Sequence, residues 1–197
     1  MGFDLTGLNP HIKGKEPEEP DNLWENESVR KVYFKKRQRF LNKNKGVYFR
    51  NNCWWWRPLA NYVLEYTKVI DKKNQQTWQF NDCSEVDEHH ATQIAKQLDH
   101  LIKSGHTKKY EKTYEHRREI IEGLNKGIEK ELSTFSKSVE KKLNKPDLAP
   151  CDFPEEDKKK WDRIYSKRNS DGHYPFAEKN VKEFSEFCRN SGGFTIG

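Results

Sequence analysis

The chain has 197 residues, a formal net charge of +6 at pH 7, and 13% aromatic residues. This combination excludes an intrinsically disordered chain, which pairs few aromatic residues with strong charge repulsion. No apolar run approaches the roughly 20 residues that cross a bilayer, and no signal-peptide pattern opens the chain, so we exclude a membrane span and expect a cytoplasmic protein.

We expect a single domain over residues 1–197, opening with a short strand at 2–5. A charged insertion follows at 13–46, with acidic residues first and basic residues after them. Within it, the pattern allows a basic helix that begins at Ser28. It equally allows a β-hairpin that pairs 32–34 with 47–49, and the sequence does not separate the two.

The middle of the chain has clearer helical periodicity. Apolar spacing predicts a helix over 57–72, with Pro58 in its first turn, and a second helix over 84–103 that opens with a Ser84/Asp87 capping box. Residues 107–145 predict one long helix, or a helical hairpin broken at Gly123 and Gly127, that protrudes from the domain.

The C-terminal part predicts two more helices and a strand. One helix begins at Asp152 or Pro154, and the last has Pro175 in its first turn. Residues 193–196 predict a strand beside the N-terminal one. The fold class is therefore mainly α, with about five helices and a minimal two- or three-stranded β element that joins the N- and C-termini.

The basic residues are concentrated in one segment. Residues 16–27 contain six acids and no base, whereas 28–57 contain ten bases and no acid. Interleaved with Tyr33, Phe34 and Phe40, these bases suit binding to a phosphate backbone with stacked bases. The candidate nucleic-acid-binding residues are Lys31, Lys35, Lys36, Arg37 and Arg39. The plainer interpretation is a solvated face that pairs with the acidic segment before it.

Three consecutive tryptophans form the most unusual stretch of the chain. They cannot share one face of any regular element, so we expect some in the core and one near solvent. An exposed indole beside guanidinium and amide groups suits a nucleotide. The candidate ligand-binding residues are Arg50, Asn51, Asn52, Trp54, Trp55, Trp56 and Arg57, together with His90 and Tyr174 from later in the chain.

Catalytic and metal-binding patterns are weak. Glu85, Asp87, His89 and His90 cluster at a predicted helix start, where acids also complement the helix dipole. No third ligand has metal-site spacing, and no phosphate-binding loop or nucleophile motif is present, so we predict no catalytic residue, no metal and no cofactor. The four cysteines are widely spaced, which favours buried thiols over zinc ligands or disulfides.

Three segments resemble a family of short uncharacterised bacteriophage and bacterial proteins. They are MGFDLTGLNP at 1–10, YFRNNCWWWRPLANYV at 48–63 and YPFAEKNVKEFSEFCRNSGGFTI at 174–196. Relatives carry a C-x-x-C insert where this chain has its long helix, so a zinc role does not carry over. The resemblance implies a phage origin, a host-cytoplasmic location, and binding to host components or evasion of host defence.

The leading functional hypothesis is a non-enzymatic protein that sequesters a nucleotide-like anion, such as a host signalling nucleotide. The alternative is an inhibitor that binds nucleic acid or a host protein through the basic 28–57 segment. A third hypothesis is a metal-assisted hydrolase that uses Asp87, His89 and His90. The long helix is a candidate surface for self-association, and we expect no membrane partner.

Overall fold

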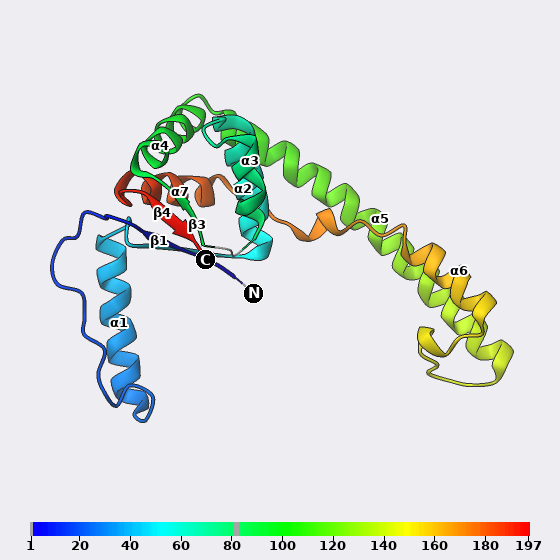
Figure 1. Cartoon of the computed structure of the whole chain (residues 1–197). Helices are drawn as coiled ribbons and strands as arrows, with labels where there is room; N and C mark the ends of the chain where they lie inside the picture. Colours follow the sequence, from blue (N-terminus) through cyan, green and yellow to red (C-terminus); the bar gives the residue numbers. More distant parts are fainter. Residues whose placement is uncertain (1, 81–82) are drawn as a thin grey trace. The chain divides into compact units, whose positions relative to one another are not determined.

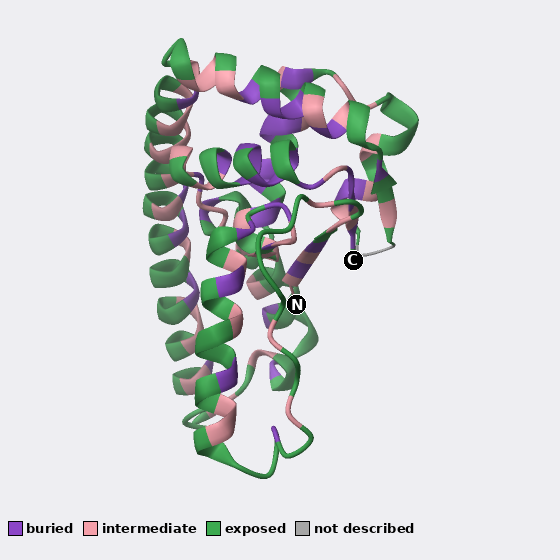
Figure 2. Cartoon of the chain, turned by 90° about the vertical axis from the view of Figure 1, so that its left-hand side faces the viewer, coloured by how far each residue is buried: buried purple, intermediate pink, exposed green. Residues whose placement is uncertain are grey.

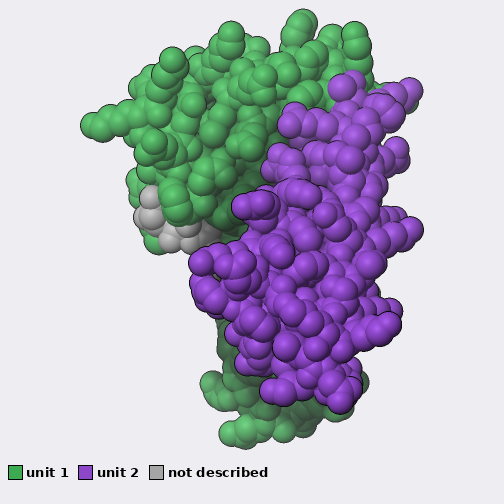
Figure 3. Space-filling view, turned by 90° about the vertical axis from the view of Figure 1, so that its right-hand side faces the viewer, with its two compact units in different colours: residues 1–111, 176–197 green, residues 112–175 purple. Residues whose placement is uncertain are grey.

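The computed structural model describes residues 2–80 and 83–197 (Figure 1). The described residues form seven α-helices and one four-stranded antiparallel sheet, which confirms the mainly α class. The helices exceed the predicted five, because a helix was one of two alternatives for Glu27–Lys43 and the short helix Lys72–Gln75 was not predicted. They divide into two compact units, coloured separately in Figure 3: Met1–Glu111 with Phe176–Gly197, and Lys112–Pro175.

The sheet of the first unit has the strand order β2-β1-β4-β3. Its strands are β1 (Gly2–Gly7), β2 (Tyr48–Asn52), β3 (Ser84–Val86) and β4 (Phe194–Ile196). Leu5 lies opposite Ile196, so the predicted pairing of the two chain ends is confirmed. The sheet is larger than the predicted two or three strands, because 48–52 and 84–86 also pair as strands.

One face of this sheet is apolar and buried, whereas the other is polar. Phe3 and Leu5 are buried and alternate with the half-buried Asp4, as expected for a strand with one face on a core. The core also contains side chains of α2 (Cys53–Thr67), α4 (Glu88–Lys103) and α7 (Glu178–Asn190). Figure 2 marks these buried positions in purple.

Trp56 lies at the centre of this core. Its side chain is fully buried and contacts Phe3, Trp78 and Phe184, with ring centroids 5.4, 5.9 and 5.8 Å away. Its indole N–H donates to the backbone carbonyl of Trp78 at 2.7 Å. The burial of one tryptophan of the run therefore has a structural explanation: a large apolar ring with its one polar group satisfied.

Several predicted helix boundaries are wrong, and for α2 and α4 the reason is that another side chain caps the helix. α2 begins at Cys53, before the predicted 57, since the Asn52 side chain accepts from the Trp55 N–H; Pro58 is thus inside the helix. α4 begins after Asp87, which caps it alone, and Ser84 belongs to β3. α7 begins at Glu178, beyond Pro175.

The charged insertion contains a helix, not the alternative hairpin. α1 (Glu27–Lys43) follows the Asn26 side chain, which accepts from the N–H groups of Ser28 and Val29. Residues 48–49 belong to β2, which pairs with β1 and not with 32–34. The remaining short elements are α3 (Lys72–Gln75) and three 3-10 turns at Gln76–Gln79, Pro150–Asp152 and Ser170–His173.

The second unit contains most of α5 (His106–Leu143) and all of α6 (Glu155–Tyr165). Of the two predicted alternatives, the one long helix is confirmed and the hairpin broken at Gly123 and Gly127 is wrong, because α5 is continuous. Each exposed helical glycine costs only about 1 kcal/mol, which a 38-residue helix tolerates. Asn125 joins the helix to the following turn: it donates to the Asn169 carbonyl at 2.7 Å and accepts from the Asn169 N–H at 3.0 Å.

The expectation of buried thiols holds only for Cys188. Its side chain is 1% exposed, and burial raises the pKa of its thiol well above the usual value. Cys83 and Cys151 are exposed, and Cys53 is half-buried.

Replacement of Trp56 tests the proposed core. Trp56→Ala leaves a cavity among Phe3, Trp78 and Phe184, and we expect it to lower the free energy of unfolding by about 3–5 kcal/mol. Trp54→Ala is the matched control, because Trp54 is 44% exposed. Urea denaturation of the three proteins measures the difference, and equal losses for both variants would contradict this description of the core.

Candidate nucleic-acid interface

In the predicted tryptophan and asparagine cluster, the asparagine side chains make contacts that hold the fold together. Asn52 caps α2, and the Asn51 amide donates to the Asn180 side chain at 3.0 Å. The Asn180 amide in turn donates to the Trp55 carbonyl at 3.4 Å. These contacts join β2 and α2 to α7, so the amides of Asn51 and Asn52 already have partners within the fold.

Arg50 lies on the polar face of the sheet beside another ionisable pair. Its Nε is 3.4 Å from the Asp4 carboxylate, which also accepts from the Tyr48 hydroxyl. Burial, with the bond to Asp4, raises the pKa of Tyr48 to about 12, so Tyr48 remains a donor at neutral pH. The positive charge of Arg50 is therefore partly compensated at this site.

The other predicted ligand-binding residues lie in separate places. Trp54 and Arg57 are exposed on the first turns of α2, Trp55 is half-buried, and Trp56 is in the core. His90 lies at the start of α4, and Tyr174 belongs to the second unit. A binding site that combines these residues therefore stays a prediction.

The acidic and histidine cluster at the start of α4 has a capping role. The Asp87 carboxylate accepts from the backbone N–H of His90 and lies 2.8 Å from its Nδ1. These hydrogen bonds, chiefly the backbone one, lower the pKa of Asp87. Within residues 2–80 and 83–197, no three His, Cys, Asp or Glu side chains converge to hold a metal ion.

The densest uncompensated charge lies on α1. Lys31, Lys35, Arg39 and Lys43 are all exposed and follow one another at steps of four residues. At this spacing side chains lie one above another on one face, so these four form a basic ridge about 18 Å long. Three of the five residues predicted for nucleic-acid binding, Lys31, Lys35 and Arg39, lie on this ridge.

The basic ridge is almost free of ion pairs. In the described part of the chain, Glu27 pairs with Lys31 at 2.8 Å, and Lys35, Arg39 and Lys43 form no ion pair. Of the acids at 16–25, Glu18 pairs with Lys15, and none pairs with α1. The acidic segment therefore neutralises the bases of α1 through one ion pair, that of Glu27 with Lys31, and the plainer interpretation accounts for this pair alone.

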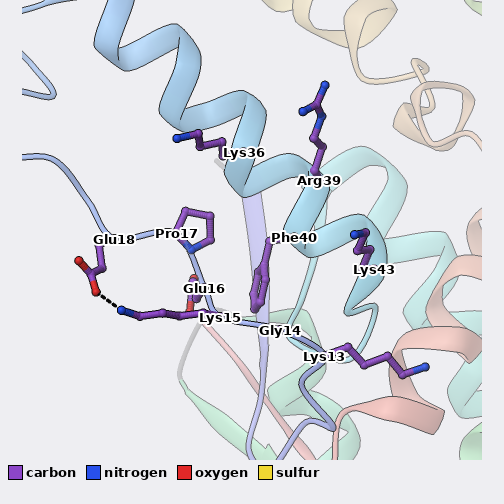
Figure 4. Close-up of a pocket in the computed structure, with 10 residues that line it drawn as sticks. All are labelled: Lys13, Gly14, Lys15, Glu16, Pro17, Glu18, Lys36, Arg39, Phe40 and Lys43. Atoms are coloured by element: carbon purple, nitrogen blue, oxygen red, sulfur yellow. Dashed lines mark hydrogen bonds and ion pairs between the residues drawn. The ribbon is translucent and has the colours of Figure 1, made fainter.

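A cavity of about 490 Å³ opens where α1 meets the preceding segment (Figure 4). The Phe40 ring and Pro17 form apolar parts of its wall. Its basic lining residues are Lys13, Lys15, Lys36, Arg39 and Lys43, against the acids Glu16 and Glu18. The cavity is therefore a basic pocket with one aromatic wall, of a size suited to a phosphorylated small molecule or a nucleic-acid segment.

Asn44 fixes the geometry of this basic pocket. The buried Asn44 side chain accepts from the Lys13 N–H at 2.6 Å and donates to the Lys13 and Phe40 carbonyls at 3.3 and 2.9 Å. These bonds join the segment to the end of α1, so the bases from the two parts of the chain stay together.

Sequence reasoning missed one exposed aromatic side chain beside α1. Trp24 is 71% exposed, and its ring contacts the edge of Phe34, itself 42% exposed, at 6.5 Å between centroids. Trp24 lies in the acidic segment, which drew attention only for its charge. The sequence did contain a signal for it: an aromatic residue that stands between charged residues, just before a basic helix, is expected to be exposed.

Comparisons with known protein families, with curated proteins and with solved structures find no match. Within the described residues, no helix is both long and apolar enough to cross a membrane.

The cap on α4 gives a pH-dependent prediction. Asp87→Ala removes an N-cap and should lower the free energy of unfolding by about 1 kcal/mol at pH 7. Because the folded-state pKa of Asp87 is below its ordinary value of 3.8, this contribution is present above that value and is lost as pH falls through the folded-state pKa. Urea denaturation at neutral and acid pH measures it. Asp87→Asn, which keeps an acceptor, is the control, and an Asp87→Ala loss that does not shrink in acid would contradict this account.

Proposed function

We propose that this protein binds nucleic acid without catalysis, through the basic ridge of α1 and the adjoining basic pocket. The observation that carries the proposal is that Lys35, Arg39 and Lys43 form no ion pair in the described chain although they share one exposed face. A phosphate backbone supplies the repeated negative charge that such a face lacks.

Helix stability does not explain the ridge. Like charges at steps of four residues destabilise a helix by a few tenths of a kcal/mol per pair. Arg118 on α5 shows the usual way to stabilise such a base, since it lies 2.8 Å from Glu115 and 2.6 Å from Glu122. The four bases of the ridge have one such pair, Glu27 with Lys31, which supports a role in binding a polyanion.

A second candidate ligand is a nucleotide-like small anion held in the basic pocket. The pocket volume of about 490 Å³ and its five basic side chains favour it. Both candidates use the same phosphate chemistry, and competition distinguishes them. A small ligand saturates the pocket at micromolar mononucleotide, whereas a nucleic-acid site is displaced by oligonucleotides and not by mononucleotides.

Charge reversal along the ridge tests the proposed function. The triple variant Lys35→Glu, Arg39→Glu and Lys43→Glu should lower affinity for a labelled oligonucleotide at least tenfold, measured by fluorescence anisotropy. For the wild type, four phosphate contacts predict a slope of about −3 for log affinity against log salt with a single strand.

The matched control for this experiment changes net charge equally but elsewhere. Lys126, Lys137 and Lys160 are exposed on helices of the second unit, and their reversal to Glu should leave affinity within about twofold of the wild type. If both triple variants lost the same affinity, net charge alone would explain the loss, and this result would contradict a site on α1.

One substitution should change oligonucleotide affinity and folding stability in opposite directions. Lys35→Glu places a carboxylate four residues from both Lys31 and Arg39, so it should raise the free energy of unfolding by about 0.5–1 kcal/mol. The same change should weaken oligonucleotide binding. Urea denaturation and anisotropy on one sample measure both, with Lys35→Gln as the neutral control. A loss of stability together with binding would contradict the assignment.

A further inference from the structure

We infer that Trp24 is a stacking platform for an unpaired nucleobase, which makes the protein selective for single-stranded over duplex nucleic acid. This inference rests on the proposed function, because it names the class of nucleic acid that the α1 surface binds. It adds a site that lies outside the basic pocket.

The indole of Trp24 is held in place although it is exposed. Its neighbour Leu23 is 2% exposed and anchors the turn, in which the Leu23 N–H donates to the Pro20 carbonyl at 3.1 Å. The Asn26 N–H donates to the Asn22 carbonyl at 3.1 Å, and the Asn26 side chain caps α1. A ring presented by an anchored turn loses little conformational entropy when a base stacks on it.

The aromatic contacts continue from Trp24 into the fold. Trp24 meets Phe34 at an interplanar angle of 65°, and Phe34 meets the buried Tyr33 at 5.4 Å between centroids. The edge contact with Phe34 braces the indole while the side chain stays 71% exposed. An indole left this exposed on a well-anchored turn has surface available for a second ring.

Basic residues surround the point where Phe34 meets Trp24. Arg30, Lys31 and Arg37 are four or three residues from Phe34, so they lie on the same side of α1. Lys31 is also the first residue of the basic ridge. A strand whose phosphates follow the ridge thus begins beside the aromatic pair.

The charges next to Trp24 in the chain indicate which part of the ligand it contacts. Asp21 and Glu25 are exposed in the same turn and would repel a phosphate. An uncharged base suits the indole, and the N–H groups of an unpaired base, such as N3–H of thymine, can donate to these carboxylates. Because a duplex hides the faces of its bases within the stack, only an unpaired base can use this platform.

The test compares the wild-type 197-residue chain with three variants. Anisotropy measures binding to a labelled oligothymidine, to the same strand carrying abasic sites, and to a duplex of equal length. Trp24→Ala should weaken oligothymidine binding about 5- to 100-fold and leave duplex and abasic binding within about twofold. Trp24→Phe should restore most of the loss, and Trp54→Ala, which removes another exposed indole, should have no effect.

The outcomes separate this inference from the proposed function. Equal affinity of the wild type for oligothymidine and for the abasic strand, or an unchanged Trp24→Ala variant, would overturn the stacking site while ridge binding stands. A wild type that binds none of the three nucleic acids would overturn both. Loss of duplex and single-strand binding alike in Trp24→Ala would show that Trp24 supports the fold of α1, and would also overturn the inference.

Discussion

The fold of the first unit depends on the burial of the Trp56 indole, because this one side chain joins four parts of the chain. It belongs to α2, contacts Phe3 on β1 and Phe184 on α7, and donates to the carbonyl of Trp78. A buried indole N–H without a partner would cost about 1–3 kcal/mol, so this bond fixes the short turn that carries Trp78. The rest of the sheet-and-helix core forms around this contact.

Burial of Trp56 also limits what the tryptophan run can do. Successive residues of a helix point about 100° apart, so Trp54 and Trp55 cannot follow Trp56 into the core. Trp54 is exposed, and Trp55 is half-buried. Placing one ring inside therefore leaves the other two nearer solvent, on other faces of α2.

The sequence predicted the periodic elements well and their ends poorly. Apolar stripes gave the existence of α2, α4, α5 and α7, because burial of one face requires that spacing. The ends of the helices depend on single capping side chains, and other residues that could cap lie nearby in the chain. Asn52 starts α2 ahead of Pro58, and Asp87 caps α4 while the Ser84 strand pairs with β4. The pairing of β1 with β4 was predicted, whereas β3 has three residues, too few to show a strand pattern, and its pairing with β4 was missed.

The candidate site was only partly predictable for a similar reason. The bases of α1 are visible as composition, and helical spacing aligns Lys31, Lys35, Arg39 and Lys43 once the helix is known. The hairpin alternative would have placed Lys31 and Lys35 at the ends of its first strand, and Arg39 and Lys43 in the connecting segment, so the basic ridge could not be derived beforehand. Lys13 joins the surface through Asn44, and Trp24 joins it through its ring contact with Phe34; both contacts link residues well separated in the chain.

Weak burial of α1 is consistent with its use as a binding surface. Only Tyr33 and Phe40 of this helix are buried, and the side chains of Asn26 and Asn44 secure its two ends. The exposed positions between these anchors contribute little to packing, so bases can occupy them at the modest cost of like-charge repulsion. A bound polyanion removes that repulsion and stabilises the folded helix by linkage. Glu16 and Glu18 line the same pocket as Arg39 and Lys43 but form no ion pair with α1 in the described residues, so the repulsion along the ridge is not relieved there. In the proposed function, α1 is therefore the helix where polyanion binding and helix stability are coupled.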